Sequence, residues 1–235
     1  MNKALTFLFI LVLSFSYAQE KIITIDYTVD YHIPKKNKTE VDTVSIGFDK
    51  SGRYLWTDSE FLAKDLGRSI FRGKEELLKD AQIGIIIDTE KLTITLFFKS
   101  GDNDIYMNVA LDAIIPISKS TKTENEFELL SEPTGETITV LDREIEVYSI
   151  YPSNKPNDTV YFALDKELEV NNSKLFNNFL SLFFASEANS QMKGLNFPNG
   201  LILNISDDGK TILEAHKLET TTKTITINHS YKITE

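Results

Sequence analysis

The sequence predicts a mainly β (α+β) protein built around one curved antiparallel sheet. Three observations lead to this fold class. Apolar and polar residues alternate along much of the chain, which is the pattern of strands with one buried and one solvent-facing side. Short segments rich in Gly, Asn and Asp separate the alternating runs and predict tight turns between them. Helical spacing of apolar residues is confined to two places, residues 58–81 and residues 174–185.

The first eighteen residues have the pattern of a secretory signal peptide. Lys3 supplies a positive start, an apolar core runs to Phe15, and Ser16-Tyr17-Ala18 places small residues before a cleavage point. This core is shorter than the roughly 20 apolar residues that a membrane-spanning helix needs. No Cys follows it, so no lipid anchor is expected there. We expect residues 19–235 to form a single β-rich domain that is periplasmic or secreted and does not span the membrane.

Composition argues against several function classes. The chain of 235 residues carries a formal net charge of −10, which disfavours nucleic acids and anionic membranes as partners. It contains no Cys, which removes thiolate catalysis, Cys-type zinc sites and iron–sulfur clusters. It also lacks a phosphate-binding loop, a dinucleotide-binding motif and a nucleophile elbow. We therefore predict no cofactor and no catalytic residue.

The first half of the chain predicts a succession of hairpins. Strands are expected at residues 23–31, 44–48, 53–57, 83–88, 92–99 and 105–111. A Gly-containing turn at residues 49–52 joins two of them, and short turns join the later ones into a meander. Residues 58–81 are expected as a helical excursion that Asp58 and Ser59 cap. Residues 118–125 are polar and lack periodicity, which predicts a long loop.

The second half continues in the same way. Its strands are expected at residues 136–141, 144–151, 159–163, 201–206, 211–218 and 222–233. Between the third and fourth of these lies a strongly helical segment, which Asn172 or Ser173 caps and which ends near Ala185. About a dozen strands with two helical insertions predict a sheet that is strongly curved or partly closed.

The helix at residues 174–185 is apolar over an unusually wide arc. At 100° per residue its seven large apolar side chains cover about 200° of the helix surface, against roughly 100° for a helix on one surface. Such a helix is either buried on both sides as a plug or lines an apolar ligand cavity with its second side. Both alternatives remain open here. The candidate lining residues are Trp56, Leu96, Phe98, Phe176, Phe179, Phe183 and Phe184.

Candidate metal ligands have simpler explanations. His32, His216 and His229 form no metal-binding spacing, although His216 and His229 would approach each other if the last two strands pair. Asp102-Asn103-Asp104 and Asp207-Asp208-Gly209 resemble fragments of calcium loops but lack the other ligands. Tight turns select the same residue types. We therefore predict no metal site.

One segment resembles a known family. Residues 192–203 read Met-Lys-Gly-Leu-Asn-Phe-Pro-Asn-Gly-Leu-Ile-Leu and follow a strand pair. They resemble the Gly-Leu-Pro-x-Gly-Leu segment of the GLPGLI-like family of exported Bacteroidota proteins, and the matching positions are Gly194, Leu195, Pro198, Gly200 and Leu201. The family often has Gly-Tyr-x-Cys before the strand at Ile145, where this chain has Leu141-Asp142-Arg143-Glu144.

The resemblance implies a LolA-like half-barrel, which is a curved antiparallel sheet whose concave face is closed by helices. In this chain those helices would be residues 58–81 and 174–185. Members of the wider fold carry or sense lipids and lipoprotein acyl chains in the cell envelope. The resemblance supplies no catalytic residue.

Three functions remain as alternatives. The first is a non-enzymatic binding protein for an apolar ligand such as a lipid or acyl chain. The second is a structural or protein-interaction module of the envelope, with a plugged core and an exposed strand edge for its partner. The third is a glycan or peptide hydrolase with two facing carboxylates, one of them with a raised pKa. We expect the first, which requires no enzymatic activity.

Overall fold

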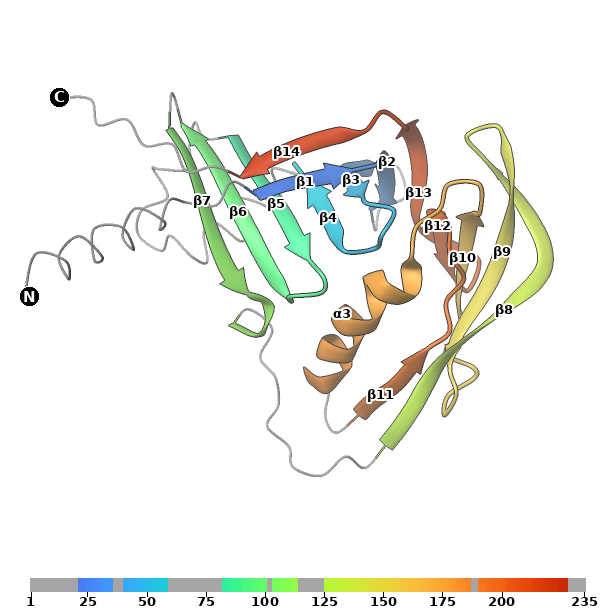
Figure 1. Ribbon diagram of the computed structural model, residues 1–235. Coiled ribbons are helices and arrows are strands. Elements are labelled where there is room, and N and C mark those ends of the chain that lie inside the picture. Colours follow the sequence, from blue (N-terminus) through green and yellow to red (C-terminus); the bar gives the residue numbers. More distant parts are fainter. Residues whose placement is uncertain are drawn as a thin grey trace, which may run out of the picture.

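Within the described residues, the chain forms a large curved sheet with an α-helix on its concave side, which we call the hollow (Figure 1). The computed structural model describes residues 21–35, 40–58, 82–100, 103–113, 125–186 and 190–227. The predicted signal peptide and residues 59–81 of the predicted helical excursion lie outside this part of the chain. The predicted fold class is confirmed, because the protein is mainly β and its curved sheet is antiparallel at every described pairing except β11 with β8. Across the described strands the sheet is open and does not close into a barrel.

In the part of the chain that the structure describes, the main sheet contains twelve strands. In sheet order they are β11 (Ser190–Leu195), β8 (Asn125–Val140), β9 (Arg143–Pro152), β10 (Val160–Asp165), β12 (Leu201–Asp207), β13 (Lys210–Glu219), β2 (Tyr27–Pro34), β3 (Val41–Phe48), β4 (Tyr54–Thr57), β5 (Gln82–Asp88), β6 (Thr93–Ser100) and β7 (Asn103–Ala110). A short 3-10 helix, η2 (Leu111–Ala113), follows β7. Strands that are consecutive in the chain mostly pair in space, because tight turns join antiparallel neighbours.

A second, two-stranded sheet consists of β1 (Lys21–Ile25) and β14 (Lys223–Ile227). Asp26 separates β1 from β2, so the strand that was expected at residues 23–31 is two strands that belong to different sheets. The last two strands do not pair with each other: β14 pairs with β1, and β13 pairs with β12 and β2. The expected approach of His216 and His229 required these two strands to pair. The described strands do not meet that condition.

The β8 end of the sheet curls strongly. Three residues of β8, Thr134-Gly135-Glu136, bulge out of the pairing with β9, between Pro133 and Thr137. A bulge bends its strand and increases the local twist. As a result β8 also contacts β13, which lies four positions away in the sheet order.

The helix α3 (Asn172–Ser186) confirms the helix that the sequence predicts at residues 174–185. It lies in the hollow of the sheet, between β4–β6 on one side and β11 on the other (Figure 1). The Oδ1 of Asn171 accepts a hydrogen bond from the backbone N–H of Lys174 at 2.9 Å, so the capping residue is one position earlier than expected. Leu175 on its first turn is buried in the main core.

The main core joins the middle of the sheet to its curled end. The Tyr31 hydroxyl, on β2, donates a hydrogen bond to the carbonyl oxygen of Ile202 on β12 at 2.6 Å and so reaches across β13. Burial raises the pKa of Tyr31, which keeps the phenol neutral and able to donate. The buried members of this core are Tyr27, Val29, Tyr31, Val44, Phe48, Val140, Ile145, Val147, Ala163, Val170, Leu175, Leu201, Leu203 and Ala215.

Candidate functional site

The strand residues that were predicted to line one cavity lie on two faces of the sheet. Leu96 on β6 pairs with Ile85, whereas Trp56 on β4 pairs with Ile86. Successive residues of a strand point to opposite faces, so Trp56 faces away from the side that carries Leu96 and Phe98. Trp56 is buried under the small β1–β14 sheet, in a cluster with Ile23, Ile25, Ile86 and Ile227. The structure therefore separates Trp56 from the other predicted lining residues.

Leu96 and Phe98 lie on the face of β5–β7 that continues into the α3 side of the sheet. Leu55, Ile87 and Ile94 form one cross-strand row on this face. Leu55 packs against the core that contains Leu175 of α3, and Ile87 packs against the cluster of Leu96 and Phe98. We call this cluster the β5–β7 apolar wall; its buried members are Ile83, Ile85, Ile94, Leu96, Phe98 and Leu111.

On α3, Phe176 connects the main core to a second apolar cluster on the other side of the hollow. Its ring lies 5.3 Å from that of Phe197, which in turn makes an edge-to-face contact with Phe162 at 5.1 Å. One turn further on, Leu180 packs near β8 and β11. We call the buried residues on this side the β8–β12 apolar wall; they are Tyr148, Ile150, Leu164, Phe197, Ile202, Phe127, Leu129 and Met192.

The remaining three predicted lining residues also belong to α3. Phe179, Phe183 and Phe184 lie on the helix backbone within Asn172–Ser186, and their side chains are outside the described part of the structure. The structure thus brings Leu96, Phe98 and the helix to the same side of the sheet.

The first half of α3 is fastened to the hairpins of the sheet. The backbone N–H of Asn171 donates to the carbonyl oxygen of Lys50, in the β3–β4 turn, at 3.0 Å. The side-chain amide of Asn178 donates to the carbonyl oxygen of Thr89, in the β5–β6 turn, at 3.3 Å. These contacts place the helix at one end of the β3–β6 strands and fix its distance from the β5–β7 apolar wall.

The segment that carries the family resemblance holds the other side of the helix N-terminus. The buried side-chain amide of Asn172 donates to the carbonyl oxygens of Pro198 and Gly200, each at 2.8 Å. Gly200 has a φ of +145°, and a Cβ there would lie 3.0 Å from the carbonyl oxygen of Asp165. Only glycine accommodates this backbone angle and this close approach. Residues 196–200 therefore hold the N-terminus of α3 in place.

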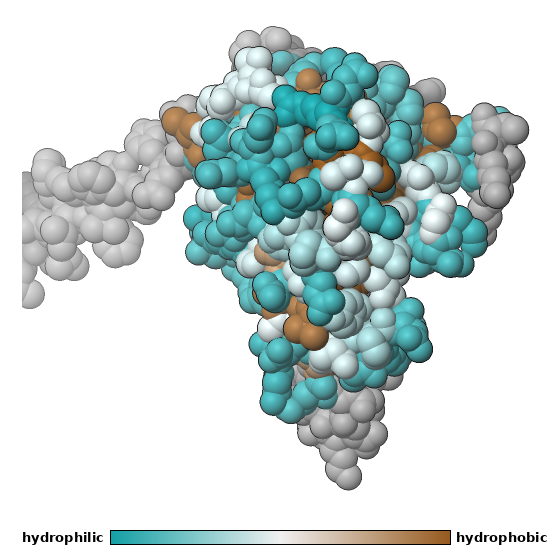
Figure 2. Space-filling view, turned by 90° about the vertical axis from the view of Figure 1, so that its right-hand side faces the viewer, coloured by the Kyte–Doolittle hydropathy of each residue, from teal (hydrophilic) through white to brown (hydrophobic). Residues whose placement is uncertain are grey.

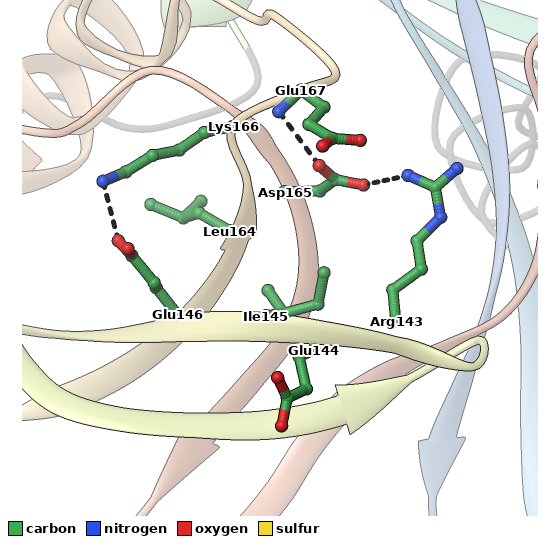
Figure 3. A pocket seen from close by; sticks show the side chains of 8 residues that line it. All are labelled: Arg143, Glu144, Ile145, Glu146, Leu164, Asp165, Lys166 and Glu167. Carbon is green, nitrogen blue, oxygen red and sulfur yellow. Dashed lines mark hydrogen bonds and ion pairs between the residues drawn. The ribbon is translucent and has the colours of Figure 1, made fainter.

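A recess of about 350 Å³ lies between β9 and the turn that follows β10 (Figure 3). Two ion pairs span it: Arg143 Nη1 to Asp165 Oδ2 at 2.5 Å, and Lys166 Nζ to Glu146 Oε2 at 2.7 Å. The side chain of Glu144 points away from the recess (Figure 3). Between the ion pairs lie the buried side chains of Ile145 and Leu164. The recess is apolar at its floor, and four of the charged residues that flank it form the two ion pairs.

The pKa of Glu146 argues against this residue as an acid catalyst. Hydrogen bonds from Lys166 and from the Tyr148 hydroxyl, both at 2.7 Å, lower the pKa of the Glu146 carboxyl. In turn the hydrogen bond to Glu146 raises the pKa of Lys166. A carboxylic acid that protonates a leaving group at neutral pH requires the opposite shift. The arrangement instead keeps Glu146 and Lys166 charged and paired with each other.

A buried carboxylate, Asp88, lies at the end of β5. It accepts hydrogen bonds from Arg53 Nη2 and from the backbone N–H of Lys91, both at 3.0 Å, and Lys21 Nζ lies 3.5 Å away. Burial by itself raises the pKa of Asp88, but the hydrogen bonds from Arg53 and Lys91 and the charges of Arg53 and Lys21 outweigh it, so the pKa is lowered. Asp88 thus links Lys21 of β1 and Arg53, which precedes β4, to the end of β5, and its role is structural.

The histidines are arranged differently from the sequence-based expectation. His32 on β2 stacks on His216 of the neighbouring strand β13, with ring centroids 4.1 Å apart, and His229 lies outside the described residues. Across the described ranges, no three His, Cys, Asp or Glu side chains are grouped to hold a metal ion. Within the same ranges, no helix is long and apolar enough to cross a membrane.

No protein-family model and no curated protein sequence matches the chain. Among solved structures the chain is similar to PNGF-II in the C2 space group, with 12% sequence identity and a TM-score of 0.36, and to PNGF-II in the P21 space group, with 11% identity and a TM-score of 0.34. These matches cover 83% and 86% of this chain and 27% and 28% of the PNGF-II chain. The chain therefore spans less than a third of the length of the proteins it matches.

Proposed function

We propose that this protein is an exported, non-enzymatic binding protein that holds an apolar ligand, such as a lipid or acyl chain, in the hollow beside α3. The observation that carries the proposal is that α3 stands between two separate apolar surfaces, the β5–β7 apolar wall and the β8–β12 apolar wall (Figure 1). A helix that is apolar over about 200° can contact both. An acyl chain would lie along α3 and cover one of these surfaces.

The expected affinity follows from the buried hydrocarbon. Each buried methylene contributes about 0.8 kcal/mol, so a chain of about 15 methylenes contributes about 12 kcal/mol. Loss of the ligand's translational and rotational freedom costs at least about 4 kcal/mol. The net value is then at most about 8 kcal/mol, which corresponds to a dissociation constant of about 1 μM or weaker. Such an affinity suits a carrier that must also release its ligand.

The proposal includes the setting of the protein. The signal-peptide pattern of residues 1–18 supports export to the periplasm or beyond. The matching positions of the Gly-Leu-Pro-x-Gly-Leu segment support membership of the GLPGLI-like exported proteins with a LolA-like half-barrel. Pro198 and Gly200 support this resemblance. Their carbonyl oxygens accept hydrogen bonds from Asn172 and so position the helix that would contact the ligand.

A second candidate function is an interaction module whose hollow is plugged by α3. The observation that favours it is the fastening of the helix on two sides, through Asn171 and Asn178 to the hairpins and through Asn172 to residues 198–200. The hydrolase alternative gains no support from Asp88 or Glu146, because the pKa of each carboxyl is lowered.

Displacement of a fluorescent fatty acid tests the proposal. Phe176→Glu and Met107→Glu place a charge on α3 and beside the β5–β7 apolar wall, respectively, and each should weaken binding about tenfold or more. Ile22→Glu is the control, because Ile22 is 63% exposed on β1 and away from the hollow. Circular dichroism and Trp56 emission verify that each variant is folded. Parental affinity in both folded variants would contradict the proposed site, and no binding by the parent protein would favour the plugged module.

A further inference from the structure

The curled end of the sheet contains a second recess, of about 330 Å³. It is distinct from the hollow beside α3 and from the recess between the two ion pairs. Figure 2 faces the β8–β9 side of the molecule, where hydrophilic side chains cover most of the surface and apolar residues show only in small patches between them. The recess is lined by residues of β8, β9, β10, β12 and the β12–β13 turn, namely Glu136, Ile138, Val147, Tyr161, Ala163, Asn204, Ser206 and Gly209.

The bulge of β8 places a carboxylate at this recess. Gly135 adopts a φ of +79°, and the hydroxyl of Thr134 donates to the carbonyl oxygen of Val147 at 3.0 Å. The backbone N–H of Glu136 donates to the same Thr134 hydroxyl oxygen at 3.1 Å. The backbone that carries Glu136 is thus held by hydrogen bonds, although its side chain is exposed.

A buried amide contributes to the wall of the recess. Asn204 is 5% exposed and follows three buried aliphatic residues on β12, Leu201, Ile202 and Leu203. Its Nδ2 donates to Glu214 on β13 at 3.0 Å, which fixes the side chain. A buried amide is costly unless its polar atoms are hydrogen-bonded. With Nδ2 bound to Glu214, the oxygen of this amide is the atom that would accept a hydrogen bond from a ligand.

The lining has the chemistry of an amine site. It combines one carboxylate, an aromatic ring that is 36% exposed, hydroxyl and amide oxygens, and an apolar strip formed by Ile138, Val147 and Ala163. Among the described residues that line it there is no Lys or Arg. An ammonium group has three N–H donors and no acceptor, so it pairs with a carboxylate and neutral oxygens, and it is attracted to the face of an aromatic ring.

We infer that this recess binds a small alkylammonium ion. The ammonium group contacts Glu136, the oxygen of Asn204 and the ring of Tyr161, and the hydrocarbon part lies on Ile138, Val147 and Ala163. An anion would meet the Glu136 carboxylate with no cation in the lining to balance it. The formal net charge of −10 also favours the approach of a cation.

Titration calorimetry with n-butylammonium tests this inference, with 1-butanol and butyrate as neutral and anionic analogues of similar size. Butylammonium should bind about tenfold more tightly than either analogue, and added salt should weaken its binding. Glu136→Gln should weaken butylammonium binding about tenfold, and Tyr161→Leu about threefold. Glu144→Gln is the matched control, because it removes the same charge from the same hairpin at a residue outside the recess lining, and it should leave the affinity within about twofold.

Any of three results would overturn the inference. Equal binding of 1-butanol and butylammonium, or a Glu136→Gln variant that binds like the parent, would show that the recess does not recognise an ammonium group. If a lysine-containing peptide bound more tightly than butylammonium, the ligand would be a lysine side chain of another protein and not a free amine. Glu136 and Tyr161 are exposed, so both variants should fold like the parent protein.

Discussion

The contact between α3 and the β3–β4 turn provides a sharp test of the packing. Gly52 has a φ of +73°, and a Cβ at this position would lie 2.1 Å from the carbonyl oxygen of Asn171, just before α3. A backbone oxygen cannot rotate away as the end of a side chain can. The substitution Gly52→Ala must therefore shift either the turn or the start of the helix. Gly209→Ala is the matched control, since Gly209 has a φ of +71° and no atom within 4 Å of an added Cβ.

The two variants share one cost and differ in another. Each places Ala in the left-handed region, at about 1 kcal/mol. At Gly52 the overpacking adds about 2 kcal/mol, and loss of the 3.0 Å hydrogen bond from Asn171 to Lys50 adds about 1 kcal/mol. We expect Gly52→Ala to lower the free energy of unfolding by about 4 kcal/mol and Gly209→Ala by about 1 kcal/mol. For a domain of this size these values correspond to decreases in Tm of about 12 °C and about 3 °C.

Urea unfolding of the parent protein and both variants measures this difference. Fluorescence of Trp56, the one Trp of the chain, and circular dichroism report the transition independently. Equal destabilisation by the two substitutions would refute the reasoning, because it would mean that the turn does not pack against the start of α3.

Two further predictions concern the charged groups around β1. The Asp88 carboxyl has a lower pKa in the folded protein than its ordinary value of 3.8, so it stabilises the folded state above about pH 4 and this contribution disappears as the pH falls below 3.8. Replacement by Asn should remove that part of the acid sensitivity in urea titrations at several pH values, and an unchanged pH profile would contradict the role of Arg53 and Lys21. Lys223 Nζ lies 3.3 Å from the ring centroid of Trp56, so Lys223→Ala should shift Trp56 emission to longer wavelength and lower stability by about 1 kcal/mol. An unchanged emission spectrum would exclude that contact.

Most of the strands could be predicted because their signals are local. The hairpin expected at residues 83–88 and 92–99 is found as β5 and β6, since alternation and a short turn define both strands and their pairing. The parallel pairing of β11 with β8 and the pairing of β1 with β14 have no comparable signal. They join segments that are distant in the sequence, and only the three-dimensional fold brings them together.

The candidate site was harder to predict for the same reason. Alternation relates Leu96 to Phe98 within one strand, but the face of Trp56 depends on the register through β5, and a shift of one residue reverses the face. The roles of Asn172 and Gly200 also depend on contacts between distant segments. The wide apolar arc of α3, in contrast, could be identified from the sequence because helical periodicity is a local property.

The most direct test of the central claim is native mass spectrometry of the mature protein, purified from the periplasm without detergent, together with lipid analysis of an organic extract of the same sample. The proposed function predicts a stoichiometric apolar adduct that is lost on denaturation and that reappears in the extract. A bare protein mass that stays unchanged after incubation with envelope lipids would contradict it.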